Sequence, residues 1–280
     1  MLIAVSRTVP TVASAHDRPT DLECPSRRGR RMSGEVRWVT AFLDTPQEQA
    51  DQVESFWSRV TGYRVSPRRG ARGEFASLLP ADGDPHLKVQ TVVQPTPGGL
   101  HVDLHTDDVR ALAARAEGLG ASVGQLDAGY VVCGSPGGMT FCVVGHTASR
   151  AATPAPWPGG RSMVDQVCLD IPPSRWDQEC RFWAELTGWE LVDEDEHDEF
   201  RRLRRPEGLA LQLLLQRLDD EHAVVVGHLD LGSDDYLAET DRHLALGATE
   251  VRRTPHWVTL RDPSGRLYCV TRHPVDEPAV

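Results

Sequence analysis

The 280-residue chain repeats itself, and this repetition constrains its fold more than any other feature of the sequence. Residues 56–63 (FWSRVTGY) recur 126 positions later as residues 182–189 (FWAELTGW). Two shorter segments recur at a spacing of 127, namely 101–104 (HVDL) as 228–231 (HLDL), and 140–144 (TFCVV) as 267–271 (LYCVT). Three matches at nearly constant spacing indicate a tandem duplication, with copies at about 35–147 and 162–274.

Each copy divides again into two units of the same pattern. Residues 36–44 form an apolar, strand-like run, and residues 47–60 follow with apolar side chains at helical spacing. Gly62 is placed to end that helix, because glycine readily adopts the left-handed conformation that closes helices. Short β-rich runs come next, at 63–65, 74–79 and 87–93.

The same order recurs from residue 100 onward. The sequence predicts a strand at 100–106 and a helix at 108–119, with Asp108 as the helix N-cap. Further strands are predicted at 122–126, 130–133 and 140–144. In the second copy, Asp235 occupies the capping position. The chain is therefore predicted to be an α+β protein built from four β-α-β-β-β modules.

The repeat boundaries predict the domain organisation. Residues 1–33 carry six arginines against three acidic residues and have low hydrophobicity, so we expect a disordered N-terminal extension. Residues 149–161 are rich in proline, glycine and alanine and are predicted to form a linker. The remaining segments, 34–148 and 162–280, are the expected first and second domains.

Composition excludes several classes of function. The chain has 30 basic and 41 acidic residues, a net charge of −11, whereas nucleic-acid binding requires a dense basic face. No apolar run reaches the roughly 18–20 residues of a membrane helix, so we expect no membrane partner. The six cysteines include no C-x-x-C pair, which favours reduced thiols and a cytoplasmic location. Lys88 is the only lysine against 29 arginines, which we attribute to genomic composition rather than to chemistry.

These features together resemble a known superfamily. Four β-α-β-β-β modules, helices ending in Phe-Trp and then Thr-Gly, and a turn at 262–265 leading into a last strand resemble the vicinal oxygen chelate superfamily. More narrowly, the chain resembles its glyoxalase-like branch, which includes relatives of glyoxalases, bleomycin-resistance proteins and dioxygenases. The resemblance covers residues 35–274 and implies two domains, each with a cup-shaped, mixed eight-stranded sheet that holds a small molecule. In catalytic members, the cup also holds a divalent metal ion.

The resemblance implies that metal ligands come from the first and last strands of each module. The expected first-strand positions are Thr40, His101, Gln166 and His228, and the expected last-strand positions are Gln90, Cys142, Gln212 and Cys269. None of them is a carboxylate, although Glu usually fills the last-strand position and hard cations prefer anionic oxygen. We therefore expect no metal cofactor. The alternative is a divalent ion in the second cup, with the ligands His228, Gln166, Gln212 and Cys269.

A His-x-Asp pattern occurs in both copies. His101, Asp103 and His105 share one strand face, and His-x-Asp begins the facial triad of some iron oxygenases. The second copy repeats His228 and Asp230 but lacks the second histidine. A hydrogen-bonding role within the strand is therefore favoured over a triad.

Five tryptophans fall into two groups. Trp57, Trp183 and Trp189 lie on or just after predicted helices, so we expect them in the core. Trp38 and Trp257 lie on predicted strands and are candidates for the cup wall, where an aromatic side chain suits a flat, apolar ligand.

The sequence favours a metal-independent, glyoxalase-like protein that holds an apolar or aromatic metabolite or drug. Its expected ligand-binding residues are the eight strand positions together with Trp38 and Trp257, and no catalytic residue is assigned. Two alternatives stay open: a metal-dependent lyase, isomerase or dioxygenase, and a scaffold in which the duplication mainly supplies interface. Assembly as a homodimer is also left open.

Overall fold

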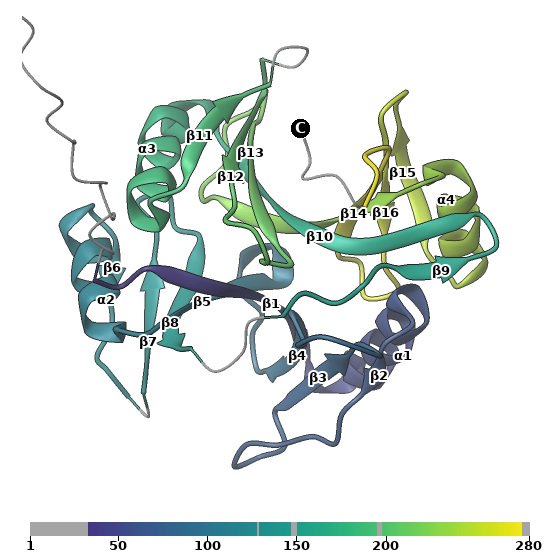
Figure 1. Cartoon of the computed structure of the whole chain (residues 1–280), viewed down its shortest axis with the longest axis horizontal. Helices are drawn as coiled ribbons and strands as arrows, with labels where there is room; N and C mark the ends of the chain where they lie inside the picture. The colour runs from purple at the N-terminus through teal and green to yellow at the C-terminus, as the bar shows by residue number, and fades with distance from the viewer. Residues whose placement is uncertain (1–32, 128, 147–149, 195–197, 276–280) are drawn as a thin grey trace, which may run out of the picture. The chain divides into compact units, whose positions relative to one another are not determined.

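The structure, a computed structural model, describes residues 33–127, 129–146, 150–194 and 198–275 (Figure 1). All of them belong to one compact unit, residues 32–280. The predicted N-terminal extension, residues 1–33, lies outside the described residues except for Ser33. Within the described ranges, each helix is too short or too polar to span a lipid bilayer.

The first domain forms one mixed eight-stranded sheet from two modules. The first module comprises β1 (Val36–Pro46), α1 (Ala50–Thr61), β2 (Arg64–Val65), β3 (Phe75–Leu79) and β4 (Leu87–Val92). The second comprises β5 (Leu100–Thr106), α2 (Val109–Gly118), β6 (Ser122–Val123), β7 (Tyr130–Gly134) and β8 (Thr140–Gly145). The strand order is β2-β3-β4-β1-β5-β8-β7-β6. The modules meet where β1 and β5 pair antiparallel, and the sheet stays open at both edges.

The second domain repeats this arrangement. Its third module comprises β10 (Gly160–Ile171), α3 (Trp176–Thr187), β11 (Glu190–Asp193), β12 (Phe200–Arg204) and β13 (Gln212–Arg217). Its fourth comprises β14 (Val226–Ser233), α4 (Tyr236–Ala245), β15 (Thr249–Arg253), β16 (Trp257–Arg261) and β17 (Leu267–Thr271). The order β11-β12-β13-β10-β14-β17-β16-β15 matches that of the first sheet. The predicted α+β fold of four modules and two sheets is confirmed. Within the predicted linker, β9 (Ala155–Trp157) pairs with the start of β10.

Local sequence signals set the ends of the helices. Gly62 and Gly188 close α1 and α3, each with a φ of 72° in the left-handed region. Asp108 caps α2 by accepting a hydrogen bond from the Ala111 amide, and Asp235 caps α4 in the same way. The predictions for Gly62, Asp108 and Asp235 are confirmed. Short 3-10 turns precede β5 and the first helix of each domain, at Pro97–Gly99, Gln47–Gln49 and Pro173–Arg175.

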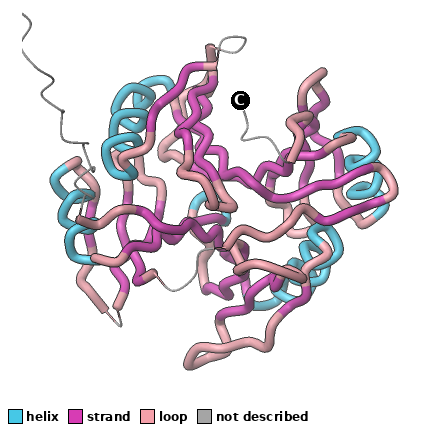
Figure 2. The backbone as a smooth tube through the Cα atoms, viewed as in Figure 1, coloured by secondary structure: helices cyan, strands magenta, loops and turns pink. Residues whose placement is uncertain are grey.

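The two domains pack against each other through contacts between the helices of one domain and the helices and strands of the other. Figure 2 shows α2 beside α3, and α1 beside α4, on opposite sides of the unit. The ring centroids of Trp57 on α1 and Tyr268 on β17 lie 5.1 Å apart. Those of Trp183 on α3 and Phe141 on β8 lie 5.3 Å apart. Trp57, Trp183 and Trp189 are at most 6% exposed, so their predicted core position is confirmed. The first helix of each domain therefore covers the last strand of the other.

Each of these two tryptophans also donates its indole N–H to a buried carboxylate. Trp57 Nε1 donates to Asp262 Oδ2 at 3.0 Å, across the domain boundary. Trp183 Nε1 donates to Glu179 Oε2 at 2.9 Å on the same helix, and Glu179 Oε1 accepts from the Gly137 amide of the first domain at 2.6 Å. The carboxylate that meets Trp57 thus comes from a turn of the opposite domain, whereas the one that meets Trp183 comes from the same helix.

Asp262 also neutralises a buried arginine. Arg266 Nη1 lies 3.0 Å from Asp262 Oδ2, and the two side chains are 5% and 0% exposed. The same guanidinium donates to the carbonyl oxygens of Asp44 and Gly99 in the first domain, at 2.9 and 3.0 Å. One ion pair of the second domain therefore fixes the end of β1.

We expect the Asp262→Asn variant to lose about 3–5 kcal/mol of unfolding free energy, because it leaves the Arg266 cation buried without an anion. Urea denaturation monitored by tryptophan fluorescence would measure this change. The control is Glu190→Gln, which breaks the exposed Glu190–Arg204 pair and should cost less than about 1 kcal/mol. Equal losses in the two variants would contradict the role given to Asp262.

His86 makes a second buried contact between the domains. It is 0% exposed, and its Nε2 donates to the Val164 carbonyl oxygen of β10 at 3.0 Å. Burial lowers the pKa of His86 to about 4, although the Val164 carbonyl and Asp165 favour the charged form. His86 therefore becomes protonated near pH 6.5 in the unfolded chain, but only near pH 4 in the folded chain.

Acidification from pH 7 to pH 4 should therefore destabilise the wild type more than the His86→Gln variant. The extra loss should approach about 3 kcal/mol, since each pKa unit corresponds to about 1.4 kcal/mol. Gln keeps a donor for the Val164 carbonyl but does not titrate. Urea midpoints at several pH values would measure the difference, and parallel pH profiles would show that His86 is not the titrating group.

Candidate functional site

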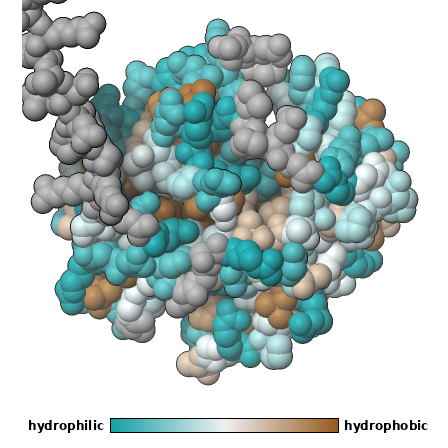
Figure 3. Space-filling view, viewed as in Figure 1, coloured by the Kyte–Doolittle hydropathy of each residue, from teal (hydrophilic) through white to brown (hydrophobic). Residues whose placement is uncertain are grey.

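Each sheet carries a cavity on the face opposite its core. On β1, Ala41 and Leu43 are buried in the core, whereas Phe42 and Asp44 line a cavity of about 530 Å³. We call this cavity the first cup, and the corresponding cavity of about 460 Å³ on the second sheet the second cup. The molecular face seen in Figure 3 is mostly hydrophilic, with hydrophobic residues set back among the polar ones. The polar and charged side chains inside the two cups are therefore the groups from which a function is inferred.

The strand register places equivalent residues at the same positions of the two cups. Phe42 pairs with His101 in the first sheet, as Cys168 pairs with His228 in the second. The equivalent pairs in the remaining strands are Asp44–Gln90 with Asp170–Gln216, and Asp103–Cys142 with Asp230–Cys269. Differences between the cups are therefore differences of side chain on one backbone frame.

In the second cup, a histidine is held between two carboxylates. His228 Nδ1 lies 2.9 Å from Asp170 Oδ2, and its Nε2 lies 3.2 Å from Asp230 Oδ1. The Cys269 sulfur lies 3.7 Å from the same Nε2 atom. A carboxylate on one ring nitrogen fixes the direction in which the other points, which is the usual arrangement for a histidine that ligates a metal.

Asp230 is itself held in place by a chain of amides. Gln212 Nε2 donates to Gln166 Oε1 at 2.6 Å, and Gln166 Nε2 donates to Asp230 Oδ2 at 2.6 Å. The other oxygen, Oδ1, is buried and accepts no hydrogen bond of good geometry among the described residues, although it forms an ion pair with His228 Nε2 at 3.2 Å. Ligand atoms of Cys168, His228 and Asp230 all lie within 4.8 Å of one another.

The charges of this cluster depend on one another. Burial alone would lower the pKa of His228, but Asp170, the neighbouring thiols and Asp230 together raise it well above its usual value. Burial raises the pKa of Cys168 and of Cys269, so both thiols are protonated at neutral pH in the protein alone. These neighbours therefore favour the protonated form of His228, with Asp170 and Asp230 on its two ring nitrogens.

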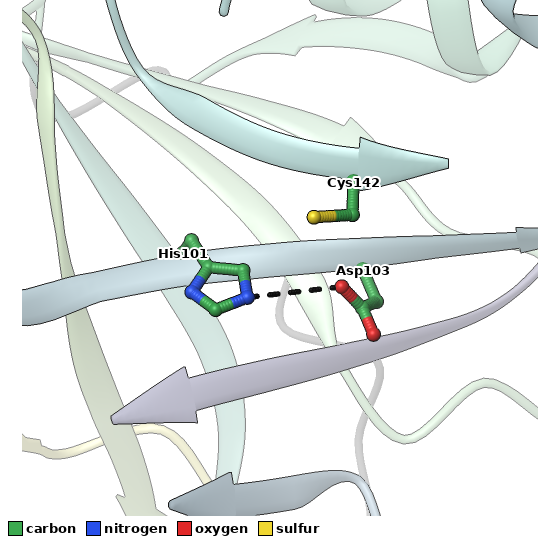
Figure 4. A group of neighbouring side chains, drawn as sticks. All are labelled: His101, Asp103 and Cys142. Carbon is green, nitrogen blue, oxygen red and sulfur yellow. Dashed lines mark ion pairs between the residues drawn. The ribbon is translucent and has the colours of Figure 1, made fainter. Parts of the chain in front are cut away.

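The first cup has a similar cluster (Figure 4). His101 and Asp103 project from β5 and Cys142 from β8, and His101 Nε2 lies 3.8 Å from Asp103 Oδ1. His101 Nδ1 contacts Asp44 at 2.9 Å, as His228 contacts Asp170. His105 does not join this group. Its Nε2 lies 2.9 Å from Thr40 Oγ1 instead, so the facial-triad arrangement is not formed.

Two side chains set the first cup apart. The Phe42 ring stacks on the His101 ring, with a centroid separation of 4.7 Å and an interplanar angle of 11°. Lys88 Nζ lies over the Phe42 ring, 5.0 Å from its centroid. The equivalent residues in the second cup are Cys168 and Leu214, since Lys88 pairs with Ser77 as Leu214 pairs with Arg202.

The residues predicted to bind a ligand fall into two groups in the structure. Seven of the ten line a cup: Gln90, His101, Cys142, Gln166, His228, Trp257 and Cys269. Three described residues, Trp38, Thr40 and Gln212, are 2% exposed or less and line neither cup. Trp38 packs instead with Met163 and Ala210. Direct ligand contact stays a prediction for the first group.

The strand register places other residues directly opposite the two cup histidines. The first-strand positions that face His101 and His228 are Phe42 and Cys168, two residues beyond Thr40 and Gln166. The position equivalent to Gln90 is Gln216 rather than Gln212. The cups also contain carboxylates, Asp103 and Asp230, which the sequence interpretation treated only as strand hydrogen-bonding groups.

Several charged cup residues were not identified from the sequence, among them Lys88, Glu194 and Arg202. Lys88 lines the first cup, and Glu194 and Arg202 line the second. Arg202 is 6% exposed, and its Nε lies 3.4 Å from Glu194 Oε1. The alternation of Phe200 and Arg202 on β12 was the available signal, because both point to one face of the strand.

The donor set of the second cup fits a divalent metal ion. An imidazole nitrogen, a thiol sulfur and a carboxylate oxygen are the three donor types of zinc sites. Zinc ligands are separated from one another by roughly 3.3–3.8 Å, so the group requires only a small contraction. In the first cup, ligand atoms of His101, Asp103 and Cys142 also lie within 4.8 Å of one another. Phe42 replaces the first-strand thiol there and Lys88 adds a positive charge, so this group fits a metal ion less well than that of the second cup.

Known structures share this fold. A manganese-bound glyoxalase from Novosphingobium aromaticivorans has a TM-score of 0.58 and 19% identity, over 87% of this chain and 84% of that one. A 2,2',3-trihydroxybiphenyl 1,2-dioxygenase from Sphingomonas wittichii has a TM-score of 0.56 and 15% identity, over 86% of this chain and 91% of that one. The chain spans 50% of a fusion of a xylose isomerase-like barrel with 4-hydroxyphenylpyruvate dioxygenase, with a TM-score of 0.58, 14% identity and 87% of this chain covered.

The sequence comparisons agree with the fold. A search of curated proteins finds no significant match. The family model of the glyoxalase-like domain matches the chain twice, at residues 40–144 and 166–271. The two matches coincide with the two sheets and together cover most of the chain. The chain therefore belongs to the glyoxalase-like domain family, in two tandem copies.

Proposed function

We propose that the protein is a glyoxalase-like binding protein whose second cup holds a divalent metal ion and, beside it, a small organic molecule. The observation that carries this proposal is the orientation of His228 by Asp170, which directs Nε2 toward the buried Oδ1 of Asp230 at 3.2 Å. Cys168 adds a sulfur within reach of both. The proposal replaces the metal-independent interpretation of the sequence, which assumed that the cups lack carboxylates.

Zinc is the ion that best matches the donors of this cup. Its sites combine imidazole, thiolate and carboxylate, and binding requires His228 and Cys168 to lose their protons. When bound, such an ion polarises an oxygen atom of a neighbouring ligand. The manganese-bound glyoxalase of similar fold supports a divalent metal ion in this protein.

The walls of the second cup suit a small organic molecule next to the ion. The rings of Phe200 and Trp257 meet edge to face at 5.7 Å, and both line the cavity. A cavity of about 460 Å³ falls in the range of small-molecule sites. Turnover by a metal-dependent lyase, isomerase or dioxygenase remains the alternative to simple binding.

The untagged protein, loaded with Zn²⁺ and desalted, should retain about one ion per chain. His228→Ala should abolish this retention, because it removes a ligand and the group that Asp170 orients. The matched control, His101→Ala, should retain the ion, because the first cup fits a metal ion less well. Mass spectrometric metal analysis would measure the stoichiometry.

Cobalt substitution tests the same site where a histidine variant fails to fold. The Co²⁺-loaded protein should show thiolate-to-metal charge-transfer absorption that Cys168→Ser removes and Cys142→Ser preserves. No retained ion in the wild type, or equal loss in the variants of both cups, would overturn the proposal.

A second prediction concerns the carboxylate behind the histidine. Asp170→Asn should weaken Zn²⁺ affinity by about 10- to 100-fold without removing a ligand, as outer-shell substitutions do. Asp44→Asn makes the same change behind His101 and should leave Zn²⁺ affinity unchanged. Competition titration with a chromophoric chelator would measure both, and unchanged affinity in Asp170→Asn would show that the Asp170 contact has another purpose.

A further inference from the structure

The first cup contains two cations that the metal site of the second cup does not explain. Lys88 projects into the first cup from β4, and Nζ forms no hydrogen bond or ion pair with any described residue. Arg69 also lines this cup, where its Nη2 donates to Ser77 Oγ at 2.9 Å. A partly buried ammonium without an anion is energetically unfavourable, so its presence requires a reason.

The electrostatics of the cup increase this cost. Burial lowers the pKa of Lys88, Asp103 partly opposes the shift, and Arg69 adds to it. The two carboxylates in the cup are engaged elsewhere. Asp44 accepts from Thr96 Oγ1 at 2.7 Å and contacts His101 at 2.9 Å, and Asp103 lies 3.8 Å from His101 Nε2. An added anion would therefore relieve the repulsion between Lys88 and Arg69.

Aromatic and apolar side chains surround these cations. Phe42 and Phe75 meet edge to face at 6.3 Å, and Tyr130 lines the same cavity at 40% exposure. The cavity of about 530 Å³ accommodates a ring system as well as an acidic group. An apolar wall next to unpaired cations is complementary to a molecule with one flat apolar part and one anionic end.

The second cup lacks this combination at the equivalent strand positions. Leu214 stands where the first cup has Lys88, and Arg202 stands where it has Ser77. Arg202 faces Glu194 in the same cavity, with Nε 3.4 Å from Oε1. The guanidinium of the second cup therefore has a carboxylate of the chain beside it, whereas the ammonium of Lys88 has none within ion-pair distance among the described residues.

We propose that the first cup is a separate, metal-independent site for an aromatic carboxylate, with the carboxylate between Lys88 and Arg69 and the ring against Phe42 and Phe75. This proposal names the ligand class of the first cup and does not depend on a metal ion in the second. It gives a chemical role to the only lysine of the chain, which composition alone did not reveal.

The test uses matched acids and amides with the full chain after treatment with EDTA. The probes are phenylacetate and 2-naphthoate, each compared with its neutral amide by isothermal titration calorimetry. The wild type should bind at least one acid about tenfold or more tightly than its amide, the discrimination expected of a charge-assisted contact. Lys88→Met should reduce this preference to less than about twofold, whereas Lys88→Arg, which keeps the charge, should retain it.

The unique lysine also allows a direct readout. Reductive methylation with ¹³C-formaldehyde labels only Lys88 and the terminal amine, and it preserves the positive charge. The acid that binds should shift the dimethyl-lysine resonance, whereas the amide at equal concentration should not. This measurement reports on the first cup even if the Lys88 variants prove unstable.

Three outcomes would overturn the proposal. The first is that neither acid binds at millimolar concentration. The second is a preference for the acid that persists in Lys88→Met. The third is a preference that disappears in Arg202→Met but not in Lys88→Met, which would move the site to the second cup. Because metal has been removed in each experiment, none of these outcomes bears on the proposed zinc site.

Discussion

The Asp262 carboxylate fixes the position of one domain on the other, and the cups depend on that position. It accepts a hydrogen bond from the indole N–H of Trp57 and forms an ion pair with Arg266. The Arg266 guanidinium in turn donates to the carbonyl oxygen of Asp44. Asp44 is also the residue whose carboxylate holds His101 in the first cup. A single buried charge therefore connects domain packing to the geometry of a binding site.

The other half of the interface reaches the same result with different residues. The turn equivalent to Asp262 begins with Ser135, and the carboxylate that meets the second tryptophan comes from Glu179 on α3. Gly137 leaves room for this contact, because a Cβ atom there would lie 2.6 Å from Val225 Cγ2 and 2.9 Å from Glu179 Oε1, so these side chains would have to shift. After duplication, the requirement for a buried carboxylate near each indole was kept, but the residue that provides it changed.

The sequence predicts the frame of this protein much better than the contents of its cups. The constant repeat spacing can be recognised directly in the sequence, and so can the glycine and aspartate residues at helix ends, which act through local interactions. The sequence does not decide between Thr40 and Phe42, because a strand alternates with period two and both residues point to the same face. Only the pairing of β1 with β5 shows which one faces His101. Likewise, Gln212 and Gln216 lie on one strand face, and the sheet register decides between them.

The two cups illustrate how one backbone frame supports opposite preferences for charge. In the second, Cys168 and Leu214 leave His228 among carboxylates and thiols, so a cation satisfies groups that otherwise need protons. In the first, the exchange of Cys168 for Phe42 removes a donor and the exchange of Leu214 for Lys88 adds a positive charge. Either change alone would weaken a metal site, since Phe42 supplies no metal ligand and the ammonium of Lys88 repels a cation. Together they distinguish the proposed cation site of the second cup from the proposed anion site of the first, around the same His-x-Asp pair.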